Sequence, residues 1–132
     1  MPKFSRASSQ RLATCHEDIR KVCNQLIKTY DFSVICGHRN KADQDKAYKA
    51  GNSKVRFPNS AHNKLPSHAV DLVPYPVDWN DIGRFKELAA AFLALADFMY
   101  DLGIIKSKFV WGGNWKTLKD FPHFEIKEIK EQ

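Results

Sequence analysis

Two histidines and two aspartates occupy positions in or beside predicted strands and loops where the fold alone does not require a polar side chain. His62 lies in a polar loop, and Asp71 interrupts the apolar run 69–73. Asp120 and His123 lie just before and at the start of a later apolar segment. Burying a carboxylate in an apolar strand is costly unless it is paired or binds a cation. Catalytic zinc sites commonly use three His or carboxylate ligands, a count that His62, Asp71 and His123 satisfy.

Each of these residues could also have an ordinary structural role. An ion pair with Arg39, or with a lysine, would account for a carboxylate inside a strand. A single histidine is more often a surface or core residue than a ligand. His68 is the rival of His62, but side chains alternate along a strand, so His68 should point away from Asp71. We therefore prefer His62 as the ligand.

The flanking sequence indicates the elements that must position these residues. Apolar residues at spacings of three and four predict one amphipathic helix over 12–30. A short polar helix over 41–50 should end at Gly51, and a long apolar helix over 83–102 at Gly103, with Asn80 or Asp81 near its start as a cap. Four short strands are predicted, over 32–36, 69–75, 109–111 and 123–126. This order predicts an α+β fold, with a small, mostly antiparallel sheet packed against helices.

Length and composition fit one domain. With 132 residues, we expect a loose N-terminal arm over 1–10 and a single domain over 11–132. No apolar run is long enough for a membrane span, and the N-terminus lacks the apolar stretch of a signal peptide. Cys15, Cys23 and Cys36 show no metal-ligand spacing, so we interpret them as small core residues. The net charge of +6 comes without a basic block, which argues against a nucleic-acid binder.

Ordered short motifs resemble those of the zinc D,D-/L,D-peptidases, which include VanY-type carboxypeptidases and phage L-alanyl-D-glutamate endolysins. The matching segments are Ser60-Ala61-His62, Ser67-His68-Ala69-Val70-Asp71, Asp120-Phe121-Pro122-His123, Cys36-Gly37-His38-Arg39-Asn40 with Gln44, and Trp111-Gly112-Gly113-Asn114-Trp115. Two features depart from the family pattern. The spacing from His62 to Asp71 is two residues longer than usual, and Ser67 replaces the usual glycine.

The resemblance implies a D-Ala-D-Ala-peptidase-like (hedgehog-like) fold and roles for individual residues. His62, Asp71 and His123 would hold Zn²⁺, and Asp120 would be the general base. Arg39 would face the substrate carbonyl or carboxylate. Glu125 is the rival base, although we favour a supporting role. Gln44, Ser60 and Trp111 are predicted to bind substrate, while at least one of the two tryptophans of the 111–115 turn should be core.

We therefore expect a monomeric zinc peptidase that cuts peptidoglycan stem peptides, with neither nucleic acid nor stable membrane insertion involved. An L-alanyl-D-glutamate endopeptidase, acting as a phage or prophage endolysin, is the preferred hypothesis. The alternatives are a D-alanyl-D-alanine carboxypeptidase and a non-catalytic wall-binding or structural phage protein. The missing signal peptide suggests synthesis in the host cytoplasm and action on the wall, or in the periplasm, after release.

Overall fold

Four antiparallel strands form one sheet in the order β1-β2-β4-β3. The computed structural model describes residues 2–128. The strands are β1 (Phe32–Cys36), β2 (Ala69–Pro74), β3 (Phe109–Trp111) and β4 (His123–Ile126). All three pairings are antiparallel, so the predicted α+β class and the antiparallel sheet are confirmed.

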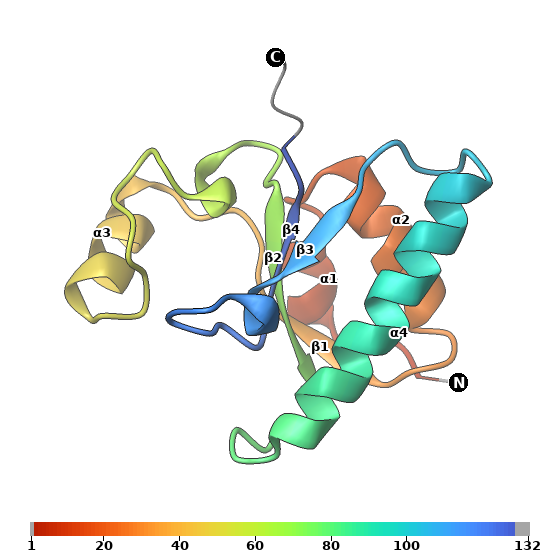
Figure 1. Cartoon of the computed structure of the whole chain (residues 1–132). Coiled ribbons are helices and arrows are strands. Elements are labelled where there is room, and N and C mark those ends of the chain that lie inside the picture. Colours follow the sequence, from red (N-terminus) through yellow and green to blue (C-terminus); the bar gives the residue numbers. More distant parts are fainter. Residues whose placement is uncertain (1, 129–132) are drawn as a thin grey trace.

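The two faces of the sheet differ in chemistry because side chains alternate along each strand. Val70, Leu72 and Phe124 are buried in the hydrophobic core. Helices α2 (Glu17–Leu26) and α4 (Ile82–Asp101) cover that face, whereas α3 (Lys41–Lys49) lies on the other side (Figure 1). Asp71 and His123 are direct partners across β2 and β4 on the face opposite the core. Strand alternation and register alone therefore bring these two residues together.

The N-terminal part departs from prediction, because the helix expected over 12–30 is confined to α2 (Glu17–Leu26) and a separate helix precedes it. Helix α1 (Arg6–Leu12) ends before α2 begins. Between them the chain bonds to a distant segment: the Ser67 amide donates to Thr14 O and the His16 amide to Ser67 O, each at 2.9 Å. His16 then caps α2 through its Nδ1, which accepts from the Asp18 amide. These contacts interrupt a sequence whose apolar pattern would continue as a helix.

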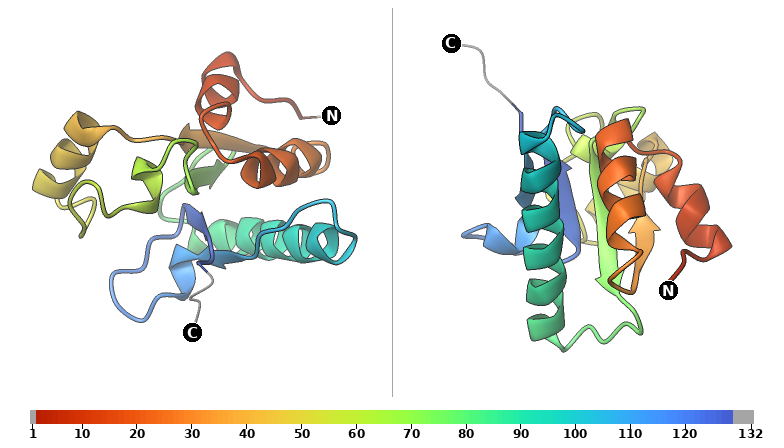
Figure 2. Two further views of the ribbon diagram at one scale, coloured as in Figure 1. Left: turned by 90° about the horizontal axis from the view of Figure 1, so that it is seen from above. Right: turned by 90° about the vertical axis from the view of Figure 1, so that its right-hand side faces the viewer.

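The loose arm expected over 1–10 is also wrong for most of its length. Residues 6–10 belong to α1, which Ser5 caps, and Ser8 is buried. The Ser8 hydroxyl accepts from the Val34 amide at 3.0 Å and donates to Val34 O at 3.4 Å, while Arg11 also donates to Val34 O. Helix α1 thus lies along β1, at the edge of the sheet away from β3 (Figure 2).

The remaining helices lie where they were predicted. Helix α3 is followed by Gly51 and α4 by Gly103, and both glycines have positive φ, the conformation that ends many helices. The side chain of Asp81 caps α4. The segment between α3 and β2 contains only the short 3₁₀ helix η1 (Ala61–Asn63). Across the described residues, no helix combines the length and apolar character needed to cross a bilayer.

Candidate metal centre and its cavity

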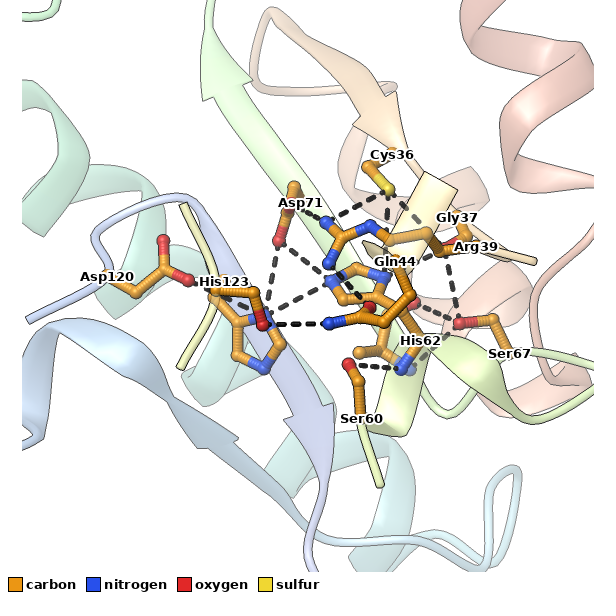
Figure 3. A network of polar contacts seen from close by, with 12 residues as sticks. Cys36, Gly37, Arg39, Gln44, Ser60, His62, Ser67, Asp71, Asp120 and His123 are labelled. Atoms are coloured by element: carbon orange, nitrogen blue, oxygen red, sulfur yellow. Dashed lines mark hydrogen bonds and ion pairs between the residues drawn. The ribbon is translucent and has the colours of Figure 1, made fainter. Parts of the chain in front are cut away.

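Three donor atoms converge on the polar face of the sheet (Figure 3). His62 Nε2 and His123 Nδ1 each lie 3.2 Å from Asp71 Oδ1, and the two nitrogens are 3.3 Å apart. Tetrahedral zinc with bonds of about 2.0–2.1 Å separates its ligand atoms by about 3.3 Å. The spacing of the donors therefore fits one zinc ion.

The outer contacts of both histidines determine which ring nitrogens can bind a metal when the rings are neutral. His62 Nδ1 is 2.7 Å from Gly37 O, and His123 Nε2 is 2.7 Å from a Glu125 carboxylate oxygen. Each of these nitrogens must carry the proton, because its partner only accepts. In the neutral rings His62 Nε2 and His123 Nδ1 are then unprotonated and face a carboxylate oxygen. Three lone pairs aimed at one point need a cation, and second partners of this kind are usual for metal-bound histidines.

The same convergence shifts the proton equilibria of the three groups. Burial opposes the charged form of His62, but hydrogen bonds to Asp71 and Cys36 outweigh it and raise the pKa to about 10. Burial also opposes charge on His123, whose hydrogen bonds to Asp71 and Glu125 raise its pKa to about 9. Burial favours neutral Asp71, yet the two histidines hold its pKa well below the usual range. Protons and a metal ion would therefore compete for the same lone pairs.

His62 reaches the centre despite its longer spacing from Asp71, because η1 is anchored at several points. Ser60 caps η1 by accepting from the His62 amide at 3.2 Å, and the Asn63 side chain accepts in return from the Ser60 amide. The Arg39 amide donates to His62 O at 2.8 Å. His68 lies elsewhere, with its ring against that of His16 at 5.4 Å. In this geometry His62 lies in the donor cluster and His68 does not.

Arg39 lies beside the donor cluster, where it pairs with Asp71 without blocking the donor atoms. Its Nη2 is 3.8 Å from Asp71 Oδ2, the carboxylate oxygen that does not face the histidines. The ion pair and the metal site, proposed as alternatives, are therefore compatible. Cys36 Sγ lies 3.6 Å from Arg39 Nη2 and 3.8 Å from His62 Nδ1, so the prediction of a core cysteine is wrong for Cys36. Cys15 and Cys23 are buried in the core as expected.

Gln44 does not face the cavity, contrary to its predicted contact with substrate. Its side chain is fully buried. The carbonyl oxygen accepts from Arg39 Nη1 and Asn63 Nδ2, each at 3.1 Å, and the amide donates to Ser53 and Val55. With its hydrogen-bonding groups occupied and its surface inaccessible, Gln44 positions Arg39 and η1 instead.

Two carboxylates flank His123 in different ways. Asp120 Oδ2 is 3.9 Å from Nδ1, the nitrogen that faces Asp71, whereas Glu125 bonds the opposite ring nitrogen. Burial, followed by the nearby charge of Asp71, raises the pKa of Asp120 above its ordinary value. The Asp120 segment approaches closely because residue 112 is glycine: a Cβ there would lie 2.4 Å from Asp120 O. Asp120 thus lies on the side of the His123 ring that faces the donor cluster, and Glu125 accepts from the other side.

A cavity of about 870 Å³ opens above the cluster. Its floor includes His62, Asp71 and His123, and Ser60 lies at its border. Trp115 lines it, with its ring 5.1 Å from that of His123. Trp111 does not: it is 7% exposed and its indole donates to Phe121 O at 2.7 Å. Nothing in the geometry supports the predicted substrate contact of Trp111, whereas the expectation that one of the two tryptophans belongs to the core is confirmed.

Several lining residues carry no sequence signal that could have marked them. They lie in the exposed segments after α3 and after the 3₁₀ helix η2 (Gly112–Asn114), or in the loop before α4. They include Lys54, Asn59, Trp79, Thr117, Leu118 and Lys119. Only folding brings these segments around one cavity.

The fold and the site together define a class: a small α+β protein with two histidines and one aspartate converging in an open cavity, the arrangement used by metal-dependent hydrolases. A family model described as phage L-alanyl-D-glutamate peptidase matches residues 1–130. The chain belongs to this family.

Two individual proteins are similar to this chain over most of its length. The crystal structure of the L-Ala D-Glu endopeptidase ChiX of Serratia marcescens has a TM-score of 0.76 and 32% identity, covering 95% of this chain and 90% of that one. The peptidoglycan L-alanyl-D-glutamate endopeptidase CwlK of Bacillus subtilis (strain 168) is 31% identical over 107 residues, which are 75% of this chain. The match spans 62% of the length of CwlK.

Proposed function

We propose that this chain is a zinc-dependent endopeptidase that hydrolyses the L-alanyl-D-glutamate bond of peptidoglycan stem peptides. The observation that carries the proposal is the convergence of His62 Nε2, Asp71 Oδ1 and His123 Nδ1 within 3.3 Å at the floor of an open cavity. The bond is taken from the family description and from the names of ChiX and CwlK. The chain itself contributes the metal ligands and the acid–base group that such hydrolysis needs.

His62, Asp71 and His123 would hold the zinc ion. Zinc polarises the scissile carbonyl and makes water a better nucleophile at neutral pH. Gly37 O and Glu125 keep the two rings in the tautomers that leave the inner nitrogens free to bind. The metal-binding geometry is therefore set by contacts around the ligands as well as by the ligands.

Asp120 would take the proton of the attacking water and deliver it to the leaving amine of glutamate. Its carboxylate is partly exposed to the cavity and lies next to His123. The raised pKa brings it closer to the range in which one group can both accept and donate a proton. Arg39 lines the cavity on the side of Asp71 Oδ2, where its guanidinium can donate to the carbonyl oxygen as negative charge develops.

We further propose that the chain acts as a monomeric phage or prophage endolysin on the stem peptide, after release from the host cytoplasm. The support is the phage origin in the family description and the presence, in one chain, of every group that the reaction uses. Ser60 would contribute to substrate binding from the border of the cavity, beyond its capping of η1.

Mass spectrometry of purified muropeptides tests the proposal. Digestion should release a peptide that begins with glutamate and leave L-alanine on the muramoyl group. Dialysis against a strong chelator should abolish the products, and added zinc should restore them. Free D-alanine as the main product from pentapeptide stems would identify a carboxypeptidase instead. Binding to the wall without any new product would identify a non-catalytic protein.

A further inference from the structure

The charges that line the cavity predict an anionic substrate. Three carboxylates, Asp71, Asp120 and Glu125, are matched by three cationic side chains, Arg39, Lys54 and Lys119. With the two histidines neutral as ligands, a bound divalent cation leaves the cavity with net positive charge. A cavity of that sign attracts negatively charged groups.

Two of the cations have no carboxylate partner among the described residues. Arg39 is engaged by Asp71 and Gln44. Lys54 and Lys119 are exposed and lie on different walls, in the segment after α3 and in the segment after η2. Lys119 Nζ donates one hydrogen bond, to Gly113 O at 3.2 Å, which orients the ammonium and leaves two donors free. Lys119 is thus a partly fixed, unpaired cation at the cavity.

The position of Lys119 relates it to one side of the scissile bond. It precedes Asp120, the group that would protonate the leaving amine, and both line the cavity. The segment that carries both residues is tied back to η2 by the Asp120 amide, which donates to Gly112 O at 3.1 Å. In the proposed reaction Lys119 would therefore lie on the side of the glutamate, because its neighbour Asp120 would protonate the amine of that residue.

We propose that Lys119 binds the free carboxylate of that glutamate and selects substrates in which it is not amidated. The inference rests on the proposed function. A glutamate within a peptide has two carboxyl groups, one that continues the chain and one that stays ionised at neutral pH. The free carboxylate and the leaving amine belong to the same residue, so they meet the same wall. Amidation removes the negative charge. It also replaces one of the two acceptor oxygens with an NH₂ group, which cannot accept a hydrogen bond from an ammonium.

Paired stem peptides test the inference, one with the free glutamate carboxylate and one with its amide. The wild-type zinc enzyme should cleave the free carboxylate form with a kcat/KM roughly tenfold to a hundredfold higher, the range expected for one charge-assisted hydrogen bond. Lys119→Gln should lower kcat/KM for this peptide by a similar factor and leave the amide peptide nearly unchanged. Lys119→Arg should retain most of the preference.

Matched variants separate the possible outcomes. Lys116→Gln removes an exposed lysine of the same segment that does not line the cavity, so it should leave the preference intact. Thermal melts of Lys119→Gln should match the wild type. Equal cleavage of both peptides by the wild type, or loss of preference in Lys54→Gln and not in Lys119→Gln, would overturn the assignment. Cleavage of neither peptide between alanine and glutamate would mean that the proposed function itself fails.

Discussion

The floor and the walls of the cavity are built in opposite ways. The floor consists of His62, Asp71, His123 and Glu125, whose side chains are held by at least one hydrogen bond and are mostly inaccessible to solvent. The walls are the segments 51–59 and 115–119, in which most side chains are exposed. In the proposed reaction the chemistry would depend on the firmly held floor, whereas the choice of substrate would depend on exposed wall side chains, which can vary without disturbing the fold.

Asp71→Ala should have the largest effect on turnover and gives the strongest test of the floor. Removing the shared carboxylate leaves two facing histidines without their common partner, so metal content, activity and melting temperature should all fall. Elemental analysis, the muropeptide assay and thermal melts would measure the three effects. Asp101→Ala, which removes an exposed aspartate at the end of α4, is the control and should change none of them. A fully active Asp71→Ala protein would remove the basis for the metal site.

Asp120→Asn should come next, because Asp120 is proposed to transfer protons next to the metal ligands without holding the metal. Loss of general acid–base help costs roughly a hundred- to ten-thousand-fold in rate. Zinc content and melting temperature should stay near those of the wild type, which separates this variant from Asp71→Ala. If Asp120→Asn lost zinc while Asp71→Asn kept it, the two roles would be reversed. If Asp120→Asn remained active, Glu125 would become the leading candidate for the base.

Glu125→Gln should have an intermediate effect. The amide oxygen can still accept from His123 Nε2, but the negative charge that strengthens the ring as a ligand is lost. Changes of this kind typically lower metal affinity or activity by roughly ten- to a hundredfold. Competition with a chromogenic chelator would measure the affinity. Glu128→Gln, at an exposed glutamate paired with Lys64, should leave it unchanged. An unaltered zinc affinity in Glu125→Gln would show that this contact does not support the centre.

The two tryptophans of the 111–115 turn give the smallest expected effect on turnover and the sharpest contrast between interior and wall. Trp115 is 37% exposed, so Trp115→Ala should raise KM a few-fold and leave the melting temperature nearly unchanged. Trp111→Ala should destabilise the fold by about 3–5 kcal/mol. Chemical denaturation and steady-state kinetics would measure both variants. A large loss of stability in Trp115→Ala would place Trp115 with the interior instead.

The floor could be predicted because local rules determine most of it. Alternation along a strand places Asp71 on the face opposite Val70 and Leu72, and the same rule places His123 and Glu125 opposite Phe124. The pairing of Asp71 with His123 then requires only that two short strands align in the observed register. The helices that end at Gly51 and Gly103 were predictable for a similar reason, since their stop signals lie within the sequence of each element.

Contacts between distant segments account for the predictions that differ from the structure. Ser67, far along the chain, interrupts the helix expected over 12–30. Gln44 matches a substrate-binding position by resemblance, yet Asn63, Ser53 and Val55 surround its amide. The sequence does not show which tryptophan meets Phe121 O. Lys54 and Lys119 were missed because lysines are common on surfaces, and only the folded chain brings these two to one cavity.

Helix α1 has a consequence for how copies of this protein behave at high concentration. An edge strand with free amide and carbonyl groups is a template on which a second chain can add a strand. Ser8 and Arg11 occupy both backbone groups of Val34, so the middle of β1 offers no such template. Deleting the first twelve residues would expose this edge without touching the metal centre. Such a truncated protein should self-associate through intermolecular strand pairing, detectable as fibril-type dye binding, although every residue of the cavity is retained.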